Sequence, residues 1–379
     1  MGQPPTPNKF KAGLEGIVAA QSEICNIDGE KGILVYAGYD IHDLADHATF
    51  EEVIFLLWNL RLPNQKELKA LKKDLEDNCE APKEILEFIK KIAKKSKAMD
   101  VLRTAVSYLS YYDSEMEDAS REANERKALR IVAQFPSLVA AYHRFRQGKK
   151  YVPHKPGMSY AERFVYQLNG EKPLEEAAKA MDLVLVLHAE HSFNASTFAG
   201  RVAAGTLTDI YSAVTAAIAA LKGPLHGGAN EVVFKMLEEI GSVANVRRYV
   251  EDKLSRKEKI FGFGHRVYKT LDPRATHLMQ MSERLGRAHN DLRWFEISRE
   301  IHKVVKELKN IEANVDFYSA SVYHLLGVPG DLFTSIFAIS RSSGWTAHIL
   351  EQYRNNRLIR PEAEYIGQQN LKYIPIEKR

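Results

Sequence analysis

Two segments in the middle of the chain are apolar on nearly every side, and they restrict the fold more than any other feature. They are MDLVLVL at 181–187 and IYSAVTAAIAAL at 210–221. A helix without a polar face must be buried all round, and neither segment reaches the ~20 residues of a membrane-spanning helix. The second segment is rich in Ala and Ser, which permits close approach of neighbouring helices. We therefore expect both in the core or at a subunit interface.

Amphipathic helical patterns lie on both sides of these segments. Thr49 and Asn64 each precede a glutamate by three residues, the pattern of a capping box at a helix start. The periodicity predicts helices over 65–78, 82–96, 99–112, 120–147, 229–240, 245–256, 273–286, 291–309, 315–326 and 331–353. Strands are indicated only by GIVAAQSEICNIDGEKGILVYAG, where Asp28-Gly29 separates two apolar runs. The expected fold class is all-α with a small N-terminal β-hairpin, preceded by a polar tail at 1–11.

The composition is that of an ordinary globular chain, 45% hydrophobic and 27% charged, and 379 residues suggest two domains. The formal net charge of +4 favours small anions but is too diffuse for a nucleic-acid surface. Cys25 and Cys79 lie far apart, which is typical of a reducing cytosol and predicts no disulfide framework. No secretory signal is visible. We expect a cytoplasmic protein without a membrane or nucleic-acid partner.

Three loops each place a titratable side chain beside residues that favour turns. His226 lies in GPLHGGANE at 223–231, His265 in GFGHRVYK at 262–269, and Asp316 in NVDFYS at 314–319. Taken singly, His226 could cap the buried helix before it, and Asp316 could be the N-cap of the helix after it. Neither explanation accounts for Gly or Asn beside a titratable group in all three loops. Two histidines and a carboxylate are suited to moving a proton off carbon and onto oxygen.

Three arginines add a possible anion site. Arg274 follows a helix start marked by Asp272-Pro273, and Arg341 lies in the apolar run FAISRSSGW, where burial would require an anionic partner. Arg360 lies in RLIRP. Together they could hold a dicarboxylate through bidentate pairs. For Arg274 and Arg360 a surface charge at a helix end is the alternative.

The pair His188-x-x-His191 raises the question of a metal, because an i, i+3 pair shares one helix face. The chain has no HExxH motif, no Cys–His spacing and no acidic cluster near this pair. We therefore expect no metal, and a core histidine or a substrate hydrogen bond at these positions.

The ordered motifs GPLHGGANE, GFGHRVYK with DPRA at 272–275, NVDFYSAS and FAISRSSGWTAHILEQ followed by NNRLIRP resemble those of citrate synthases, the short prokaryotic form most closely. The likeness runs from about Gly13 to Gly367 and includes HAEHSFNASTF at 188–198. It implies a large helical domain formed by 12–222 and 323–379, and a small helical domain at 223–322 that closes over the active site. It also implies a homodimer with active sites shared between subunits.

The resemblance implies that the chain condenses acetyl-CoA with oxaloacetate and water to give citrate and CoA, the entry step of the tricarboxylic acid cycle, without a cofactor. Asp316 would take the methyl proton, His226 would hydrogen-bond the thioester oxygen, and His265 would polarise the ketone. This agrees with the chemistry, since a carboxylate removes so weakly acidic a proton only if a donor stabilises the enolate oxygen, by roughly 3–4 kcal/mol.

The resemblance also implies binding positions. Oxaloacetate would contact His191, Arg274, Arg341 and Arg360, the last from the partner subunit, and supporting roles would fall to Ser196, next to His226, and Asn314. CoA contacts would come from Lys253, Arg256, Lys257, Lys259, Gly262 and Gly264. For the basic residues a solvated helix face is an equal alternative.

The closest alternative is a 2-methylcitrate synthase that uses propionyl-CoA, since one methylene is worth only about 1–3 kcal/mol in a pocket. A metal-dependent hydrolase built on His188 and His191 and a non-catalytic helical dimer are further alternatives. Two departures from the family pattern, Ala37 in Tyr36-Ala37-Gly38 and Glu312-Ala313 before Asn314, do not touch the implied chemistry. Acyl-CoA preference, regulation by nucleotides, assembly beyond a dimer and temperature adaptation stay open.

Overall fold

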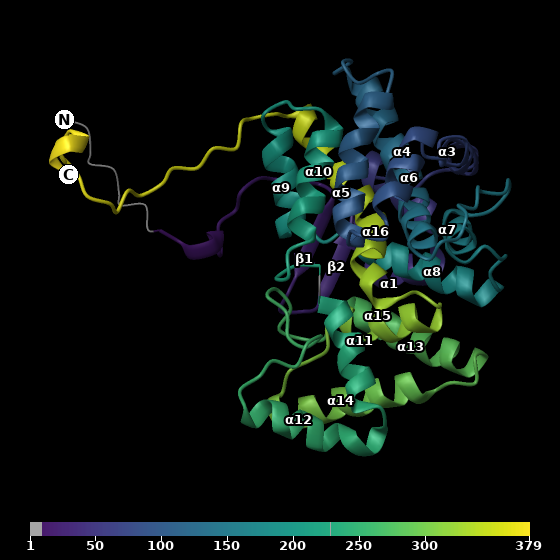
Figure 1. Cartoon of the computed structure of the whole chain (residues 1–379). Helices are drawn as coiled ribbons and strands as arrows, with labels where there is room; N and C mark the ends of the chain where they lie inside the picture. The colour runs from purple at the N-terminus through teal and green to yellow at the C-terminus, as the bar shows by residue number, and fades with distance from the viewer. Residues whose placement is uncertain (1–9, 228) are drawn as a thin grey trace.

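The predicted all-α fold is confirmed. In the residues that the computed structural model describes, 10–227 and 229–379, sixteen α-helices accompany one small sheet (Figure 1). The helices are α1 Ile41–His47, α2 Phe50–Asn59, α3 Gln65–Asp77, α4 Lys83–Ile92, α5 Ala98–Leu109, α6 Arg121–Arg146, α7 Tyr160–Asn169, α8 Glu175–His188, α9 Ala195–Ala204, α10 Ile210–Leu221, α11 Ala229–Ile240, α12 Val246–Ser255, α13 Pro273–Ala288, α14 Arg293–Lys309, α15 Val315–Leu325 and α16 Phe333–Arg354. Most of the predicted polar tail lies outside the described residues. None of the described helices has the length and apolarity needed to cross a membrane.

Helix α16 forms the axis of the larger helical layer. It is buried along nearly its whole length and packs against α6, α8, α9 and α10. The Ala-rich α10 is buried beside α9, where a side chain added at Gly200 would come within 3.4 Å of Ala217. The close helix approach predicted from the small residues is therefore present, and it is an intrachain contact.

The helices from α11 to α15 gather at one end of the molecule, beyond the ends of α8 and α16 (Figure 1). Their amphipathic faces bury one another, chiefly α13 against α15, α11 against α15 and α12 against α14. The loop of His226 connects α10 to α11 and thus joins this group to the larger layer. The loops of His265 and Asp316 lie within the group, between α12 and α13 and between α14 and α15, and the His265 ring lies 5.2 Å from that of His191 in the segment between α8 and α9.

The N-terminal hairpin forms as predicted and supports one of these loops. Strands β1 Cys25–Asp28 and β2 Ile33–Tyr36 pair antiparallel, and a short β3 Tyr39–Asp40, absent from the prediction, extends the sheet. A Cβ at Gly29 would lie 2.2 Å from the carbonyl oxygen of Val267, and the Lys269 N–H donates to the Gly29 carbonyl at 2.9 Å. The hairpin turn thus lies directly against the loop that carries His265.

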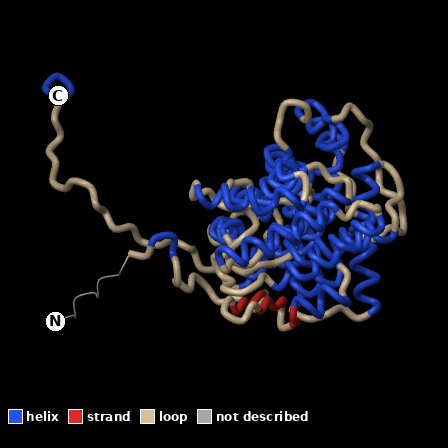
Figure 2. The backbone as a smooth tube through the Cα atoms, turned by 90° about the horizontal axis from the view of Figure 1, so that it is seen from below, coloured by secondary structure: helices blue, strands red, loops and turns tan. Residues whose placement is uncertain are grey.

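The chain leaves the body of the molecule after α16. Residues 355–379 run outward as an extended segment with a single 3₁₀ turn near the end, Ile376–Lys378 (Figure 2). Several large apolar side chains of this segment are exposed, namely Leu358, Tyr365, Ile366, Leu371, Tyr373, Ile374 and Ile376.

Candidate active site

The loops that carry His265 and Asp316 are paired through their backbones. The Gly264 N–H donates to the Glu312 carbonyl at 3.0 Å, and the Asn314 N–H donates to the Gly262 carbonyl at 2.9 Å. The Asn314 side chain adds a hydrogen bond from Nδ2 to the Gly264 carbonyl at 2.9 Å. Positive φ angles at Gly262 and Gly264 permit this approach, and a Cβ at Gly262 would lie 2.8 Å from the Phe317 ring. Two loops about 50 residues apart in sequence therefore form one unit.

His265 has a fixed tautomer. Its Nδ1 accepts hydrogen bonds from the backbone N–H groups of Val267 and Tyr268, at 3.0 and 3.2 Å. An N–H can only donate, so Nδ1 is unprotonated, the ring is neutral and the proton lies on Nε2. Burial, followed by the charge of Arg274, lowers the His265 pKa to about 4. The side chain is therefore a neutral hydrogen-bond donor at physiological pH.

His226 is held through its Nε2, which lies 2.9 Å from Ser196 Oγ. The Trp345 indole donates to the same oxygen at 3.1 Å, the Ser196 hydroxyl donates to Asn194 Oδ1 at 2.7 Å, and the Ser196 backbone N–H points to His226 Nε2 at 3.3 Å. Asn194 Oδ1 already accepts from the backbone N–H groups of Ser196 and Thr197, at 3.2 and 3.1 Å. Burial, then the charge of Arg341, lowers the His226 pKa to about 4. The predicted contact between Ser196 and His226 is thus present.

Asp316 is not the helix cap that the sequence allowed as an alternative. Asn314 is the N-cap of α15, and its Oδ1 accepts from the Asp316 N–H at 3.0 Å. Asp316 is the second residue of the helix, and its partly buried carboxylate makes no hydrogen bond or ion pair to another described residue. Burial raises its pKa to about 6, against the opposing effect of Arg274. A free carboxylate with a raised pKa is suited to accept a proton.

The two buried arginines differ in their partners. Arg274 donates from Nε and Nη2 to the two carboxylate oxygens of Asp272, at 3.0 and 2.8 Å, and this buried pair also receives the Val315 N–H. Arg341 donates from Nε to the His188 carbonyl at 2.8 Å, but its buried Nη2 has no partner and no described carboxylate lies within ion-pair distance. Arg341 therefore has no direct ion-pair partner among the described residues and keeps an N–H group available for an anion.

His191 and Tyr268 complete the site beside His265. The ring centroids of His191 and His265 are 5.2 Å apart, and His191 Nε2 lies 3.2 Å from the Tyr268 hydroxyl. Burial, followed by Arg274, holds the His191 pKa well below its ordinary value. Tyr268, Asp272 and Asn194 were missed by the sequence reasoning, although each lies within or next to a motif that it quoted.

The metal hypothesis for His188 and His191 rests on a geometry that is absent. Helix α8 ends at His188, so the two residues do not share a helix face. His188 donates from Nδ1 to the Val184 carbonyl and packs in the core, with ring centroids 5.0 Å from Phe337. His188 is thus a core histidine, one of the two outcomes expected.

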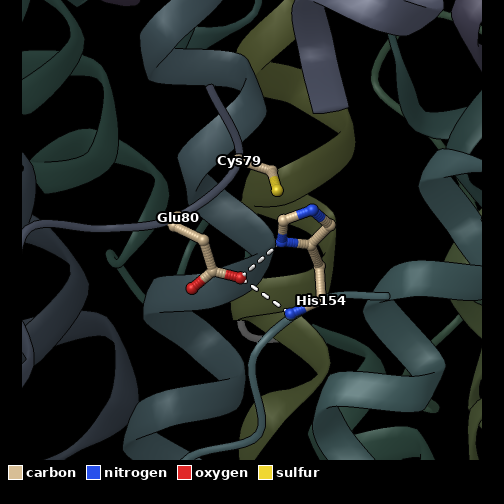
Figure 3. Close-up of side chains that lie close together, drawn as sticks. All are labelled: Cys79, Glu80 and His154. Carbon is tan, nitrogen blue, oxygen red and sulfur yellow. Dashed lines mark hydrogen bonds and ion pairs between the residues drawn. The ribbon is translucent and has the colours of Figure 1, made fainter. Parts of the chain in front are cut away.

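Among the described residues, one group, Cys79, Glu80 and His154, brings three possible metal ligands within 4.8 Å (Figure 3). Glu80 Oε1 accepts from the His154 N–H and Nδ1, at 2.7 and 2.9 Å, and Oε2 accepts from the Tyr151 hydroxyl at 2.6 Å. Burial raises the Cys79 pKa to about 11, which disfavours a thiolate ligand. The group is explained as a hydrogen-bonded brace that fastens the segment at 150–158.

The remaining candidates lie apart from this site. Arg360 is exposed in the segment after α16 and lines a cavity of about 990 Å³ together with N-terminal residues such as Ile17 and Ser22. Lys253 pairs with Glu258 at 2.7 Å, and Arg256 with Asp252 at 2.5 Å. Lys257 and Lys259 make no ion pair with another described residue.

A helical fold that carries neutral imidazoles, a free carboxylate of raised pKa and a buried guanidinium without an ion-pair partner is suited to proton transfer on an anionic substrate. The profile described as citrate synthase, C-terminal domain, matches residues 13–362. The chain belongs to the citrate synthase family, which confirms the resemblance seen in its motifs.

Individual relatives agree with this assignment. The chain is 54% identical to citrate synthase 2 of Bacillus subtilis over 97% of its own length and 98% of that protein, and 40% identical to a 2-methylcitrate synthase of Shewanella oneidensis over 97% and 98%. Among solved structures, the citrate synthase of Pyrobaculum aerophilum superposes with a TM-score of 0.91 at 39% identity, covering 97% and 95% of the two chains. The ternary complex of the Thermoplasma acidophilum enzyme with carboxymethyl coenzyme A and oxaloacetate gives 0.91 at 34% identity, covering 97% and 98%.

Proposed function

We propose that the chain condenses acetyl-CoA with oxaloacetate and water to give citrate and CoA, with acetyl-CoA as a substrate and no resident cofactor. The observation that carries the proposal is the backbone pairing of the loops at 262–264 and 312–314. This pairing joins the loop of a neutral histidine donor to the start of the helix that carries a free carboxylate whose pKa is about 6. The identity to citrate synthases over nearly the whole chain supports the same reaction.

In the first step Asp316 accepts a proton from the methyl group of acetyl-CoA, and the thioester becomes an enolate. His226 would donate from Nδ1 to the developing oxyanion. We assign the proton to Nδ1 because the Ser196 backbone N–H, which can only donate, points to Nε2 at 3.3 Å. A neutral donor aimed at the enolate oxygen is worth roughly 3–4 kcal/mol in such sites.

In the second step the enolate carbon attacks the ketone of oxaloacetate. The Nε2–H of His265 would donate to the ketone oxygen, since that nitrogen is the one that carries the proton. Arg341 would bind one carboxylate through its unpartnered Nη2. Arg274 would act while paired to Asp272, which fixes the direction of its guanidinium, and His191 would add a hydrogen bond.

The citryl-CoA thioester is then hydrolysed, and water must be excluded until condensation is complete. We propose that the region at 223–322 closes over the remainder of the chain at this stage, hinged near Gly223 and Gly327. The location of the site between the α11–α15 group and the larger helical layer supports this division, as does the positive φ of Gly327.

We further propose a cytoplasmic homodimer in which Arg360 reaches the site of the partner subunit. Within its own chain Arg360 lies apart from His265 and Asp316, on a segment whose apolar side chains are exposed to solvent. Apolar surface of this kind favours burial against another protein surface. The CoA phosphates would meet Lys257 and Lys259, with Lys253 and Arg256 less available because each is ion-paired.

The test is release of free thiol with oxaloacetate, run in parallel with acetyl-CoA and propionyl-CoA. We expect turnover with acetyl-CoA, and a kcat/KM for acetyl-CoA above that for propionyl-CoA. The reverse order would identify a 2-methylcitrate synthase, an activity carried by relatives at 40% identity. Thiol release with neither substrate would refute the proposal.

A further inference from the structure

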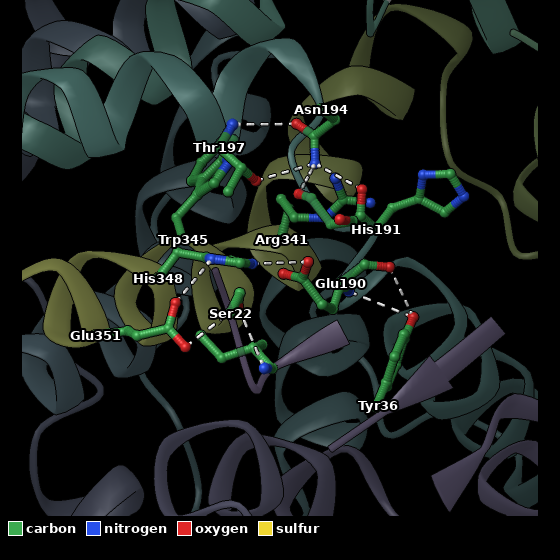
Figure 4. A network of polar contacts seen from close by, with 12 residues as sticks. Ser22, Tyr36, Glu190, His191, Asn194, Thr197, Arg341, Trp345, His348 and Glu351 are labelled. Carbon is green, nitrogen blue, oxygen red and sulfur yellow. Dashed lines mark hydrogen bonds and ion pairs between the residues drawn. The ribbon is translucent and has the colours of Figure 1, made fainter. Parts of the chain in front are cut away.

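Glu190 is a fully buried carboxylate that the proposed reaction does not use. It lies between α8 and α9, and its backbone carbonyl accepts from the Tyr36 hydroxyl at 2.9 Å (Figure 4). Its Oε1 lies 3.0 Å from His348 Nε2, whereas the buried Oε2 has no hydrogen-bond partner among the described residues. A buried ionised oxygen without a partner is costly, so a compensating charge is required.

His348 does not supply that charge. Its Nδ1 lies 3.1 Å from Arg201 Nη1, and a guanidinium can only donate. Nδ1 is therefore an acceptor, and the ring is neutral with its proton on Nε2, where it donates to Glu190. Arg201 in turn is paired with Glu351. The imidazole thus satisfies one oxygen of Glu190 by a hydrogen bond and leaves its negative charge uncompensated.

The other oxygen of Glu190 lies on the face of α16 that carries Arg341. A Cβ at Gly344 would lie only 2.2 Å from Oε2, so this oxygen rests on the helix surface at that residue. Arg341 precedes Gly344 by three positions and His348 follows it by four, which places all three on one face. Arg341 is buried, and its Nη2 has no partner. Burial lowers the pKa of Arg341, and the charge of Glu190 is the strongest influence that opposes this.

We propose that Glu190 is the resident counter-ion of Arg341, which compensates the guanidinium while the site is empty and competes with the substrate carboxylate for it. This rests on the proposed function, in which Arg341 binds a carboxylate of oxaloacetate. Glu190 is then a positioning residue that limits substrate affinity. The free protein keeps a charged, oriented arginine, and the bound carboxylate shares that arginine with a fixed negative charge, so product can leave.

The test is Glu190→Gln, which keeps the shape and the hydrogen bond to His348 but removes the charge. The ligand-free variant should melt at a lower temperature, because Arg341 loses its counter-ion. Oxaloacetate should bind to the variant at least ~5-fold more tightly than to the wild type, the low end for electrostatically coupled sites. It should also raise the Tm of the variant by more than it raises the Tm of the wild type. Calorimetric titration and thermal unfolding with and without oxaloacetate measure both effects.

Glu51→Gln is the matched control. Glu51 is also buried with one oxygen unpartnered, but its Oε1 accepts from the Tyr160 N–H, in the packing of α2 against α7. This variant should lose stability without any gain in oxaloacetate affinity.

Unchanged or weaker oxaloacetate binding in Glu190→Gln would make Glu190 purely structural and overturn the inference. If that variant does not fold, Glu190→Asp keeps the charge but withdraws it from Gly344, and must bind oxaloacetate more tightly than the wild type. A wild type that oxaloacetate fails to stabilise would refute the proposed function and the inference together.

Discussion

The carboxylate of Asp316 should be both the base of the reaction and a source of instability. Burial raises its pKa from 3.8 to about 6, so above pH 6 the folded protein carries a charge that its surroundings disfavour. The folded state binds this proton more tightly than the unfolded chain, and the free energy of unfolding therefore falls as pH rises between these values. A shift of about two pKa units lowers the free energy of unfolding by roughly 3 kcal/mol. This loss of stability is complete above pH 6 and absent below pH 3.8.

Asp316→Asn removes the charge and keeps the shape of the side chain. Turnover should fall at least ~10²-fold, because the base is lost. At pH 8 the variant should nevertheless be more stable than the wild type by up to about 3 kcal/mol, or roughly 4 °C in Tm for a chain of this length. At pH 5 the gain should be about half as large, because the folded wild-type carboxyl is then mostly protonated. Thiol release and calorimetric Tm at both pH values measure these effects.

Asp182→Asn provides the matched control. Burial raises the pKa of Asp182 to about 7, and its Oδ1 accepts from the Phe50 N–H at 3.2 Å, which an asparagine can still do. This variant should gain stability in the same pH-dependent manner and keep full turnover. Suppose that Asp182→Asn is stabilised, whereas Asp316→Asn is inactive but not stabilised. The pKa of Asp316 would then not be raised in the ligand-free protein. Near-normal turnover of Asp316→Asn would exclude it as the base.

Three further predictions concern the dimer, closure and pH. Chains carrying Asp316→Asn and Arg360→Ala should each be nearly inactive alone, and random remixing should restore roughly a quarter of wild-type activity if Arg360 serves the partner's site; no recovery despite demonstrated subunit exchange would contradict the shared site. Oxaloacetate should bind first, protect residues 223–322 from proteolysis and tighten acyl-CoA binding. Protection by acetyl-CoA alone, with none by oxaloacetate, would contradict this order of substrate binding. The kcat/KM for acetyl-CoA should fall about tenfold per unit below pH 6, as Asp316 gains its proton. Because the pKa values of His226 and His265 are about 4, a second loss of activity between pH 6 and 8 would show that one of them acts as a cation.

The sequence predicted those helices whose ends carry chemical signals. The capping boxes at Thr49 and Asn64 are formed by side chain and backbone together, and α10 and α11 match the predicted ranges. Helix α9 was missed because most of its residues are small and only Phe198, Arg201 and Val202 interrupt them, which gives little 3.6-residue contrast. Helix α1, with seven residues, is too short for periodicity to show. The helix predicted over 82–96 ends at Ile92, and residues 93–96 form a turn instead.

The chemistry of the site was only partly accessible from the sequence. The motifs identified His226, His265 and Asp316, but the tautomer of each histidine depends on which backbone or hydroxyl group faces which nitrogen. The sequence pattern suggested that the Arg274 guanidinium binds a substrate carboxylate, and it did not reveal that this guanidinium is ion-paired with Asp272. Such contacts depend on the folding of loops, which periodicity does not describe.

The hairpin turn at 29–32 bears on how this chain can be engineered. Exposed turns are where peptide tags, inserted domains and circular-permutation breaks are usually tolerated. Here the turn packs against the loop of His265 and supports it, since Gly29 lies against the Val267 carbonyl and its own carbonyl accepts a hydrogen bond from the Lys269 N–H. An insertion at this turn would displace that loop and leave the helical core intact. A library screened for expression would keep such insertions, and only a screen for turnover would discard them.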